Sequence, residues 1–390
     1  MEAVFVVSNG LECLADKEIK DKKISEKTIV TPGRISAPVN HNAVGELFQL
    51  RSIEKVLLSV IEQPLPRSEN PLPEDILQMI QSIQNEKWEE AINNWVAILK
   101  LEEILPLTFK VTVKIPKKCK IHDKTQMGKM YAEFLETKLN SIKEISHFQF
   151  EGDVFDYKLH ILINFSKGKL LVGFYLTRST LWKSRKYYST TTFEKTSLKP
   201  SICYCLIKLL NLNSDSCNTI LEPMAGSGMI IMELLDNRAE FSPRMFCIGG
   251  DISSKSVDII KKNLSFTHCH SFLYSDVLHF SASCLPIQDN SIDGIVTDLP
   301  FGKRVGSKQD NKILYPQLME EFFRVLKKNA RAVLLTTNSK LLSQIVKSNR
   351  KWKLHHQIPF NHGGLLCYIF VVSKRYVPSK NFDKNKKSEK

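Results

Sequence analysis

The residues of this chain most suited to chemistry form a short turn, Asp298-Leu299-Pro300-Phe301, which directly follows an apolar run over residues 292–297. The carboxylate of Asp298 and the carbonyls of a stiff turn can accept N–H hydrogen bonds, and the ring of Phe301 can stack on a planar group. An acceptor and a ring at one strand end suit a nucleobase with an exocyclic amine. The candidate catalytic residues are therefore Asp298, Leu299, Pro300 and Phe301.

A second candidate site lies upstream, in the loop Glu222-Pro223-Met224-Ala225-Gly226-Ser227-Gly228. Its glycines let the backbone approach a ligand closely and start the next helix. The pattern E-P-x-x-G-x-G lacks the early glycine that admits a pyrophosphate in dinucleotide sites, and Glu222 would repel phosphates. Both points favour a cofactor with amino and sulfonium groups, S-adenosyl-L-methionine, over a nicotinamide dinucleotide.

Two further acidic residues follow apolar runs. Asp251 ends a predicted strand over 245–250 and can accept from both ribose hydroxyls, or alternatively can cap the helix that follows. Asp276 ends a predicted strand over 271–275 and can accept from an adenine amine, or alternatively lies in a surface turn. The candidate cofactor-binding residues are thus Glu222, Pro223, Ala225, Gly226, Gly228, Asp251, Ile252, Asp276 and Val277.

Alternating helices and strands must position these residues from position 200 onward. Strands are expected at 218–222, 245–250, 271–275, 292–298, 330–337, 352–360 and 364–373, with helices at 201–211, 227–236, 254–265, 313–327 and 339–349. Repeated βα units predict a largely parallel sheet that binds ligands at its strand ends. A hairpin signal at residues 361–364 makes the last strand antiparallel. The predicted class is α/β, with a Rossmann-like seven-stranded sheet behind an α+β region.

The chain divides by composition into six segments. We expect an N-terminal α+β part at 1–63, a proline-broken linker with helices at 64–106, a second α+β unit at 107–178, a basic connector at 179–199, the α/β domain at 200–376 and a disordered basic tail at 377–390.

The formal net charge of +14 predicts a polyanionic partner such as nucleic acid, although a merely basic protein is the alternative. The charge is uneven: residues 110–143 carry a net +6 and residues 178–199 a net +5, whereas residues 200–300 carry a net −5. This asymmetry favours an attached polyanion-binding surface over uniform solubility.

The nine cysteines include no C-x-x-C pair, and the N-terminus lacks a secretory signature. We therefore expect a reducing compartment, the cytoplasm or alternatively the nucleus, and no membrane association. We expect no metal either, because the run His268-Cys269-His270 has no matching ligands elsewhere.

These motifs resemble the class I adenosylmethionine-dependent methyltransferases, and among them the THUMP-domain guanosine-N2 tRNA methyltransferases. The stretch 296–304 with Gly306-Ser307-Lys308 carries this resemblance, and Leu314-Tyr315-Pro316 and residues 331–336 fit the same family. The predicted strand, helix and hairpin of 107–178 resemble a THUMP module behind a ferredoxin-like unit.

The resemblance implies methyl transfer to the N2 of a guanosine in tRNA, with position 6 of the acceptor stem as the leading site. It also implies a small zinc-binding activator subunit that pairs with an exposed strand edge. A THUMP module that grips tRNA makes the RNA-binding candidates Lys117, Lys118, Lys120, Arg178, Arg185, Lys303 and Arg304.

Two residues depart from the family pattern: Glu222 stands where Asp is usual, and Leu299 replaces the first proline of the turn. Two alternative functions stay open. One is guanosine-N2 methylation of a small nuclear or ribosomal RNA, and the other is a catalytically silent RNA-binding protein.

Overall fold

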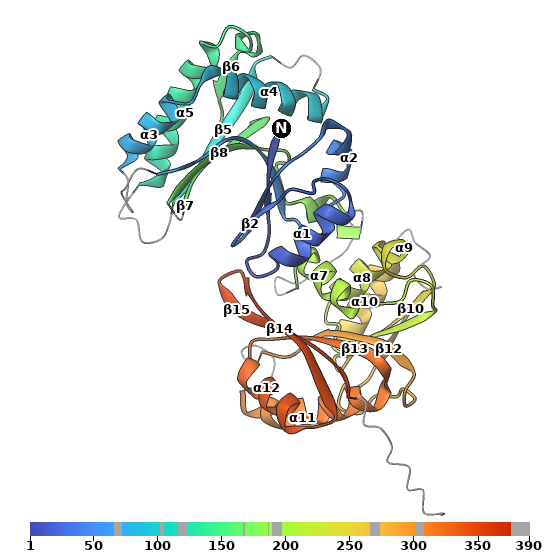
Figure 1. Cartoon of the computed structure of the whole chain (residues 1–390). Helices are drawn as coiled ribbons and strands as arrows, with labels where there is room; N and C mark the ends of the chain where they lie inside the picture. The colour runs from blue at the N-terminus through green and yellow to red at the C-terminus, as the bar shows by residue number, and fades with distance from the viewer. Residues whose placement is uncertain are drawn as a thin grey trace, which may run out of the picture. The chain divides into compact units, whose positions relative to one another are not determined.

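The structure is a computed structural model of the 390-residue chain. It describes residues 1–65, 72–101, 105–115, 123–166, 168–185, 187–188, 197–265, 274–301 and 308–375. The chain divides into two compact units, residues 1–185 and 186–390, and each is considered by itself (Figure 1).

The N-terminal unit is built on one eight-stranded sheet with strand order β2-β3-β1-β4-β8-β7-β5-β6. Its strands are β1 (Glu2–Val6), β2 (Ile29–Thr31), β3 (Arg34–Pro38), β4 (Lys55–Pro64), β5 (Leu107–Lys114), β6 (Phe150–Gly152), β7 (Leu159–Ser166) and β8 (Lys169–Tyr175). Because β4 pairs with β8, with Leu57 opposite Tyr175, the strands predicted within 1–63 and 107–178 belong to a single sheet.

Helices cover one face of this sheet. They are α1 (Glu12–Asp21), α2 (Val44–Leu47), α3 (Pro73–Gln81), α4 (Asn85–Leu99) and α5 (Lys124–Asn140), and Figure 1 shows α3, α4 and α5 gathered on the same side. Helix α4 carries two fully buried tryptophans, Trp88 and Trp95. Strands β2 and β3 form a hairpin, because Gly33 turns the chain with φ of +80°.

The C-terminal unit contains a seven-stranded sheet with order β11-β10-β9-β12-β13-β15-β14. Its strands are β9 (Asn218–Glu222), β10 (Met245–Asp251), β11 (Ser275–His279), β12 (Ile292–Asp298), β13 (Leu326–Thr336), β14 (Trp352–His362) and β15 (Leu365–Lys374). Only β15 runs antiparallel, to both β13 and β14, which confirms the predicted topology.

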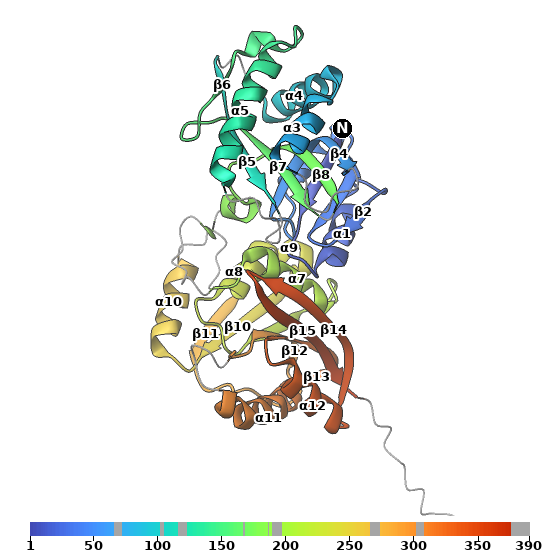
Figure 2. The ribbon, with the colours of Figure 1, turned by 90° about the vertical axis from the view of Figure 1, so that its left-hand side faces the viewer.

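Helices lie on both faces of the second sheet. Figures 1 and 2 show α7 (Pro200–Leu210), α8 (Met229–Asp236) and α10 (Ser254–Ser265) on one face and α11 (Lys308–Val325) and α12 (Ser339–Ser348) on the other, while α9 (Arg238–Phe241) follows α8. The α11 side is closed by a core that includes Phe322, Leu334, Trp352 and Phe370. Burying such large side chains supplies most of the driving force for this layered arrangement.

Two strands of this sheet differ clearly from their predicted bounds: β13 begins at Leu326 rather than at residue 330, and β11 is shifted as a whole. Strand β11 spans Ser275–His279, rather than ending at residue 275, and pairs in parallel with β10 so that Asp276 lies opposite Ile248. Ser275 and Val277 face the interior, and the ring of Phe280 lies where a side chain on Gly250 would be. These contacts fix a register that the alternation of the sequence left ambiguous.

Within the described parts of the chain, we find no helix whose length and apolar character would let it cross a membrane.

Candidate active site

Three acidic residues meet at the carboxyl edge of the second sheet. The chain leaves β9 towards β10 on one side and later returns as β12 on the other, which makes this the point where strand order reverses. Glu222, Asp251 and Asp298 each end one of these three strands. Asp298 and Asp251 both act to raise the pKa of Glu222, so the three carboxylates share one electrostatic environment.

The loop after β9 has open space next to its Gly226 backbone. The N–H of Ala225 donates to the Gly250 carbonyl at 2.8 Å, and the N–H of Gly226 donates to Asp251 Oδ2 at 2.9 Å. Gly226 and Gly228 have φ of +55° and +83°, a region that favours glycine. A side chain on Gly226 would meet nothing within 4 Å, so a ligand can approach its backbone.

Glu222 is only 4% exposed, and its Oε2 accepts from the N–H of Ile231 at 3.2 Å. Burial raises the pKa of this carboxyl well above its usual range. A cation beside it would offset that cost, whereas a phosphate would increase it. The acceptors and the open glycine backbone therefore fit a ligand with amino and sulfonium groups.

Asp251 holds the loop and does not cap the following helix. Its Oδ1 accepts from the N–H of Ser253 at 2.9 Å, and Ser253 Oγ in turn accepts from the N–H of Ser256 in the first turn of α10. The cap is therefore Ser253, which decides the alternative left open by the sequence. Each Asp251 oxygen keeps a lone pair for a ribose hydroxyl. Beside it, Ile252 is 72% exposed and offers an apolar surface.

Asp276 and Val277 lie away from this edge, which corrects their predicted placement. Asp276 is exposed and is the second residue of β11. It lies three residues before the end of the strand, a distance of about 10 Å along the chain. Val277 is buried opposite Gly249. The residues that follow the end of β11 are Phe280 and Ser281, and Ser281 Oγ lies 2.8 Å from Ser283 Oγ.

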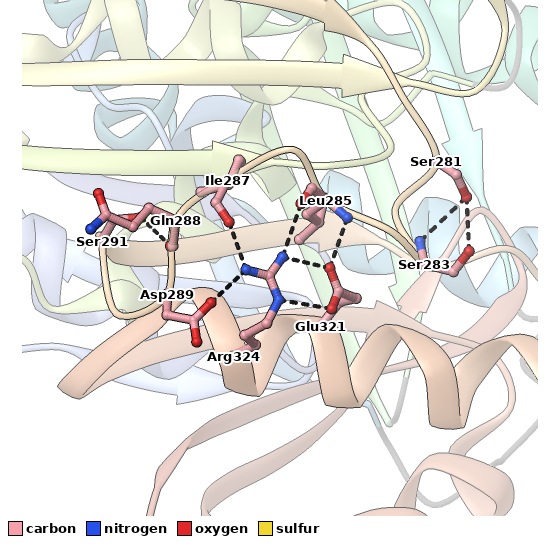
Figure 3. A network of polar contacts seen from close by, with 9 residues as sticks. All are labelled: Ser281, Ser283, Leu285, Ile287, Gln288, Asp289, Ser291, Glu321 and Arg324. Carbon is pink, nitrogen blue, oxygen red and sulfur yellow. Dashed lines mark hydrogen bonds and ion pairs between the residues drawn. The ribbon is translucent and has the colours of Figure 1, made fainter.

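The segment after β11 is tied to helix α11 by one arginine (Figure 3). Arg324 donates to the carbonyls of Leu285 and Ile287, to both oxygens of Glu321 and to Asp289, at distances of 2.6–2.9 Å. Five bonds use all five guanidinium N–H groups. Glu321 Oε2 also accepts from the N–H of Leu285 at 2.7 Å, so this helix fixes the course of the loop.

The Asp298 turn is anchored to the neighbouring strand through Leu299. The N–H of Leu299 donates to the Leu335 carbonyl at 2.8 Å, and its side chain is buried. A proline at this position could not donate that bond. Leu299 therefore replaces the stiffness of the missing proline by a hydrogen bond to β13.

A helix clamps the other side of the turn. The Pro300 carbonyl accepts from Asn311 Nδ2 at 2.8 Å and from Tyr315 Oη at 2.9 Å, which occupies both of its lone pairs. The expectation that the carbonyls of the turn accept from a base is thus corrected for Pro300. The Asp298 carboxylate remains as its acceptor, since no described residue donates to Asp298 Oδ1. Burial raises the pKa of Asp298 to about 8. The Phe301 ring is half-buried next to it.

Sequence reasoning missed several of these supporting residues. Asn311 and Ser281 belong to no recognisable motif, and Tyr315 and Thr336 were noted only as part of the family resemblance. One signal was available: Asn311 and Tyr315 stand four residues apart, on the helix face that also buries Leu318 and Phe322. Polar groups on a buried helical face need partners, and here the partner is the Pro300 carbonyl of the Asp298–Phe301 turn.

The predicted RNA-binding residues differ in their exposure to solvent. Arg178 is exposed, and its guanidinium lies 5.1 Å from the centroid of the Tyr157 ring. Arg185 is 7% exposed and donates to the Arg51 carbonyl at 2.6 Å, so it serves folding of the N-terminal unit. The remaining candidates lie outside the described residues, namely Lys117, Lys118, Lys120, Lys303 and Arg304.

No cluster of three His, Cys, Asp or Glu side chains able to hold a metal occurs among the residues that the structure describes, and His268-Cys269-His270 lies outside them.

Comparison with known proteins finds similarity to methyltransferases in the C-terminal unit. Residues 188–367 match the family model of the RMKL-like methyltransferase domain. Human tRNA (guanine(6)-N(2))-methyltransferase THUMP3 is 30% identical over 238 residues, which cover 58% of this chain and 45% of that protein. This similarity to THUMP3 therefore covers more than half of the chain. Human U6 snRNA (guanine-N(2))-methyltransferase THUMPD2 is 27% identical over 237 residues, 60% of this chain and 42% of that protein. The chain thus spans less than half the length of these curated relatives.

Solved structures extend the similarity of fold to the whole chain. TrmN from Thermus thermophilus superposes with a TM-score of 0.71 over 96% of this chain and 99% of its own, at 19% identity. A methyltransferase crystallised with SAH gives a TM-score of 0.72 over 96% of this chain and 98% of its own, at 17% identity. The chain therefore has a TrmN-like fold, including the α+β sheet of its N-terminal unit.

The buried carboxyl of Asp298 makes stability depend on pH. Its pKa is raised from 3.8 to about 8 in the fold, so its contribution to stability is fully present below about pH 4 and is lost as pH rises to about 8. In Asp298→Asn this titration is absent. We expect the difference in melting temperature, variant minus wild type, to be larger at pH 8 than at pH 5 by about 2 °C or more. Calorimetry at the two pH values measures it. A constant difference would contradict the buried state of Asp298.

Proposed function

We propose that this chain is an S-adenosyl-L-methionine-dependent methyltransferase that methylates the N2 of a guanosine in tRNA, at position 6 of the acceptor stem. One observation carries the proposal: Asp298 presents a buried, unpartnered carboxylate oxygen at a strand end shared with Glu222 and Asp251. The similarity to THUMP3, which is named for guanine-6 N2 methylation in tRNA, supports both the reaction and the target.

The cofactor would be held by the loop after β9 and by the end of β10. Glu222 supplies negative charge, Gly226 a close backbone approach, Asp251 acceptors for the ribose hydroxyls and Ile252 an apolar surface for the adenine. When bound, S-adenosyl-L-methionine supplies a methyl group on a positively charged sulfur, which keeps the C–S bonding pair as the methyl passes to N2 and the amine gives up a proton. The three carboxylates complement that positive charge.

Asp298 orients the amine that is to be methylated. In guanine the N2 lone pair is delocalised into the ring, and an acceptor on its N–H returns electron density to nitrogen and directs the lone pair. Burial raises the pKa of Asp298 to about 8, so near neutral pH a neighbouring cation is needed to favour its carboxylate form, which can then accept from N2–H and take up the released proton. Phe301 holds the base by stacking.

Asp298→Ala tests this assignment. We expect the methyl-transfer rate to fall by at least about 100-fold, as for loss of one strong electrostatic group in an active site, with RNA affinity unchanged. Asp276→Ala is the matched control, because it removes a carboxylate that the structure places away from the cofactor edge. We expect it to keep its activity within about twofold. Full activity in Asp298→Ala would refute the role of the turn, and equal losses in both variants would refute the corrected placement of Asp276.

Basic residues of the N-terminal unit would supply the affinity for RNA. Arg34, Lys55 and Lys114 come from three strands and surround Tyr175: Lys55 Nζ lies 4.3 Å from its ring centroid, and Lys114 Nζ lies 3.5 Å from its hydroxyl. Arg34 donates to Ser166 Oγ at 3.1 Å. Glu62 attracts Arg34, and Glu54 attracts Lys55 and Lys114, but no ion pair of these three cations is found among the described residues. Burial and their mutual repulsion lower the pKa of Lys55 and of Lys114.

Aromatic rings continue this basic surface. The His160 ring lies 4.6 Å from Tyr175 and 5.3 Å from Tyr157, measured between centroids, and Lys110 Nζ lies 5.2 Å from the Tyr157 ring. Burial and the nearby lysines lower the pKa of His160 to about 4, so it is neutral at physiological pH. Cations without carboxylate partners beside stacking rings suit the phosphates and bases of RNA.

The double variant Lys55→Ala/Lys114→Ala should bind tRNA more weakly. We expect the slope of log affinity against log salt to become shallower by about 1 to 2, in filter-binding titrations, because up to two phosphate contacts are lost. The control Lys20→Ala/Lys351→Ala removes the same charge from lysines already paired with Asp16 and Glu320. An equal change of the salt slope in both double variants would show that the effect comes from net charge alone. The variant Lys117→Ala/Lys118→Ala/Lys120→Ala is measured in the same assay.

An activator subunit would pair with the β11 edge of the catalytic sheet. Of the two edge strands, β14 carries Lys353, His355 and His356, a pattern that discourages strand pairing, whereas β11 exposes 37% of Leu278. Leu278→Asp should therefore abolish co-purification with a small zinc-binding activator. A matched change on the other edge, Leu354→Asp, should leave it intact if the variant remains folded by circular dichroism; the reverse pattern would place the partner on β14.

A second substrate class is favoured by the similarity to human THUMPD2, which is named as a U6 snRNA methyltransferase. The two substrates are separated by incubating the chain with total RNA and labelled cofactor, with and without the activator, and mapping the modified nucleotide. Label at guanosine 6 of tRNA supports the proposal. Label in U6 would replace tRNA as the substrate and favour the nucleus.

A further inference from the structure

Asn311 carries an acceptor for which the described structure has no donor. The residue is 1% exposed, and its Nδ2 donates to the Pro300 carbonyl at 2.8 Å. Because a carbonyl can only accept, this bond fixes which end of the amide is nitrogen. Its Oδ1 then has no hydrogen-bond donor within the described part of the chain. A buried acceptor without a donor is costly, and such sites call for a ligand or another explanation.

The neighbouring hydroxyls are already engaged in a directed chain. The N–H of Asn338 donates to Thr336 Oγ1, the Thr336 hydroxyl pairs with Tyr315 Oη, and Tyr315 donates to the Pro300 carbonyl, each at 2.9 Å. With Tyr315 donating to Pro300, the proton between Tyr315 and Thr336 comes from Thr336. Neither hydroxyl is therefore left to satisfy Asn311 Oδ1.

A second unpartnered acceptor belongs to the same turn. Asp298 Oδ1, like Asn311 Oδ1, has no donor among the described residues, and Asp298 stands two positions before the proline that Asn311 holds. The turn is thus associated with two buried acceptors, one ionisable and one neutral. The turn itself has no unpartnered donor among its described side chains, whereas the Thr297 hydroxyl directly before it, which can donate or accept, is also buried without a partner.

Two acceptors distinguish the purine bases. The edge of guanine presents the N1–H and the N2 amine side by side, two neighbouring donors, whereas adenine presents its amine beside N1, which is an acceptor. A site that opposes a second acceptor to adenine N1 leaves both unpaired. The geometry points to Asn311 as a specificity-determining residue: its Oδ1 accepts from guanine N1–H while Asp298 accepts from N2–H. This inference rests on the proposed function and deepens it, because Asp298 alone would accept either base.

The test replaces the target guanosine of the RNA by 2-aminopurine riboside, which keeps the N2 amine and lacks the N1–H. Methylation rates on the two RNAs give a preference ratio for each protein. We expect the wild type to prefer guanosine, and Asn311→Ala to lower that ratio by about tenfold, the value of one hydrogen bond. Asn311→Asp keeps an acceptor at this position and should preserve the ratio, although it loses the bond to Pro300 and methylates both RNAs more slowly.

Tyr315→Phe is the matched control, since it removes the other donor to the Pro300 carbonyl and leaves Asn311 Oδ1 in place. We expect it to slow methylation of both RNAs equally. Melting temperatures establish that each variant is folded, and if Asn311→Ala is not, Asn311→Ser takes its place. An unchanged ratio in the folded Asn311 variant would overturn the inference and leave the residue a positioning role. A wild type that methylates neither RNA would instead refute the proposed function.

Discussion

The active-site edge depends on three carboxylates that the fold holds together without a compensating cation among the described residues. Glu222, Asp251 and Asp298 end adjacent strands at the point where strand order reverses, and burial raises the pKa of both Glu222 and Asp298. Ionising these carboxyls together is unfavourable, since burial and the proximity of like charges both penalise the charged forms. A positively charged ligand relieves that cost. The sign of the cofactor's charge therefore follows from topology and desolvation.

Helix α11 connects the two halves of this edge. Near its start, Asn311 and Tyr315 hold the Pro300 carbonyl, and near its end, Glu321 and Arg324 hold the loop that follows β11. Displacing this helix would move the substrate turn and the loop together. Leu299 adds a bond to β13 that proline cannot make, so the turn is fixed by a strand on one side and a helix on the other.

The sequence predicted the strands that carry chemistry because each is a short buried run that ends in an acidic residue or a glycine. The predicted bounds of β9 and β12 match the structure. Strand β11 was shifted because residues on both sides of Ser275 alternate in polarity, and only the pairing with β10 and the packing of Phe280 on Gly250 select the register. The contacts of Asn311 and Arg324 could not be predicted from the sequence for a related reason. They join residues that come close together only when the helix packs on the sheet.

Charged residues that are far apart in the sequence can also form one cluster in the folded chain. The lysine-rich run at 110–143 drew attention to one segment, but the cluster around Tyr175 also takes Arg34 from β3 and Lys55 from β4, which are isolated cations in the sequence. Curvature and pairing of one sheet bring them together. Under the proposed function a base enters at the acidic edge of the C-terminal unit, where the carboxylates repel phosphates. Affinity for a polyanion must then come from residues elsewhere in the chain, which is why a basic surface on a separate unit and an acidic catalytic edge form a coherent pair.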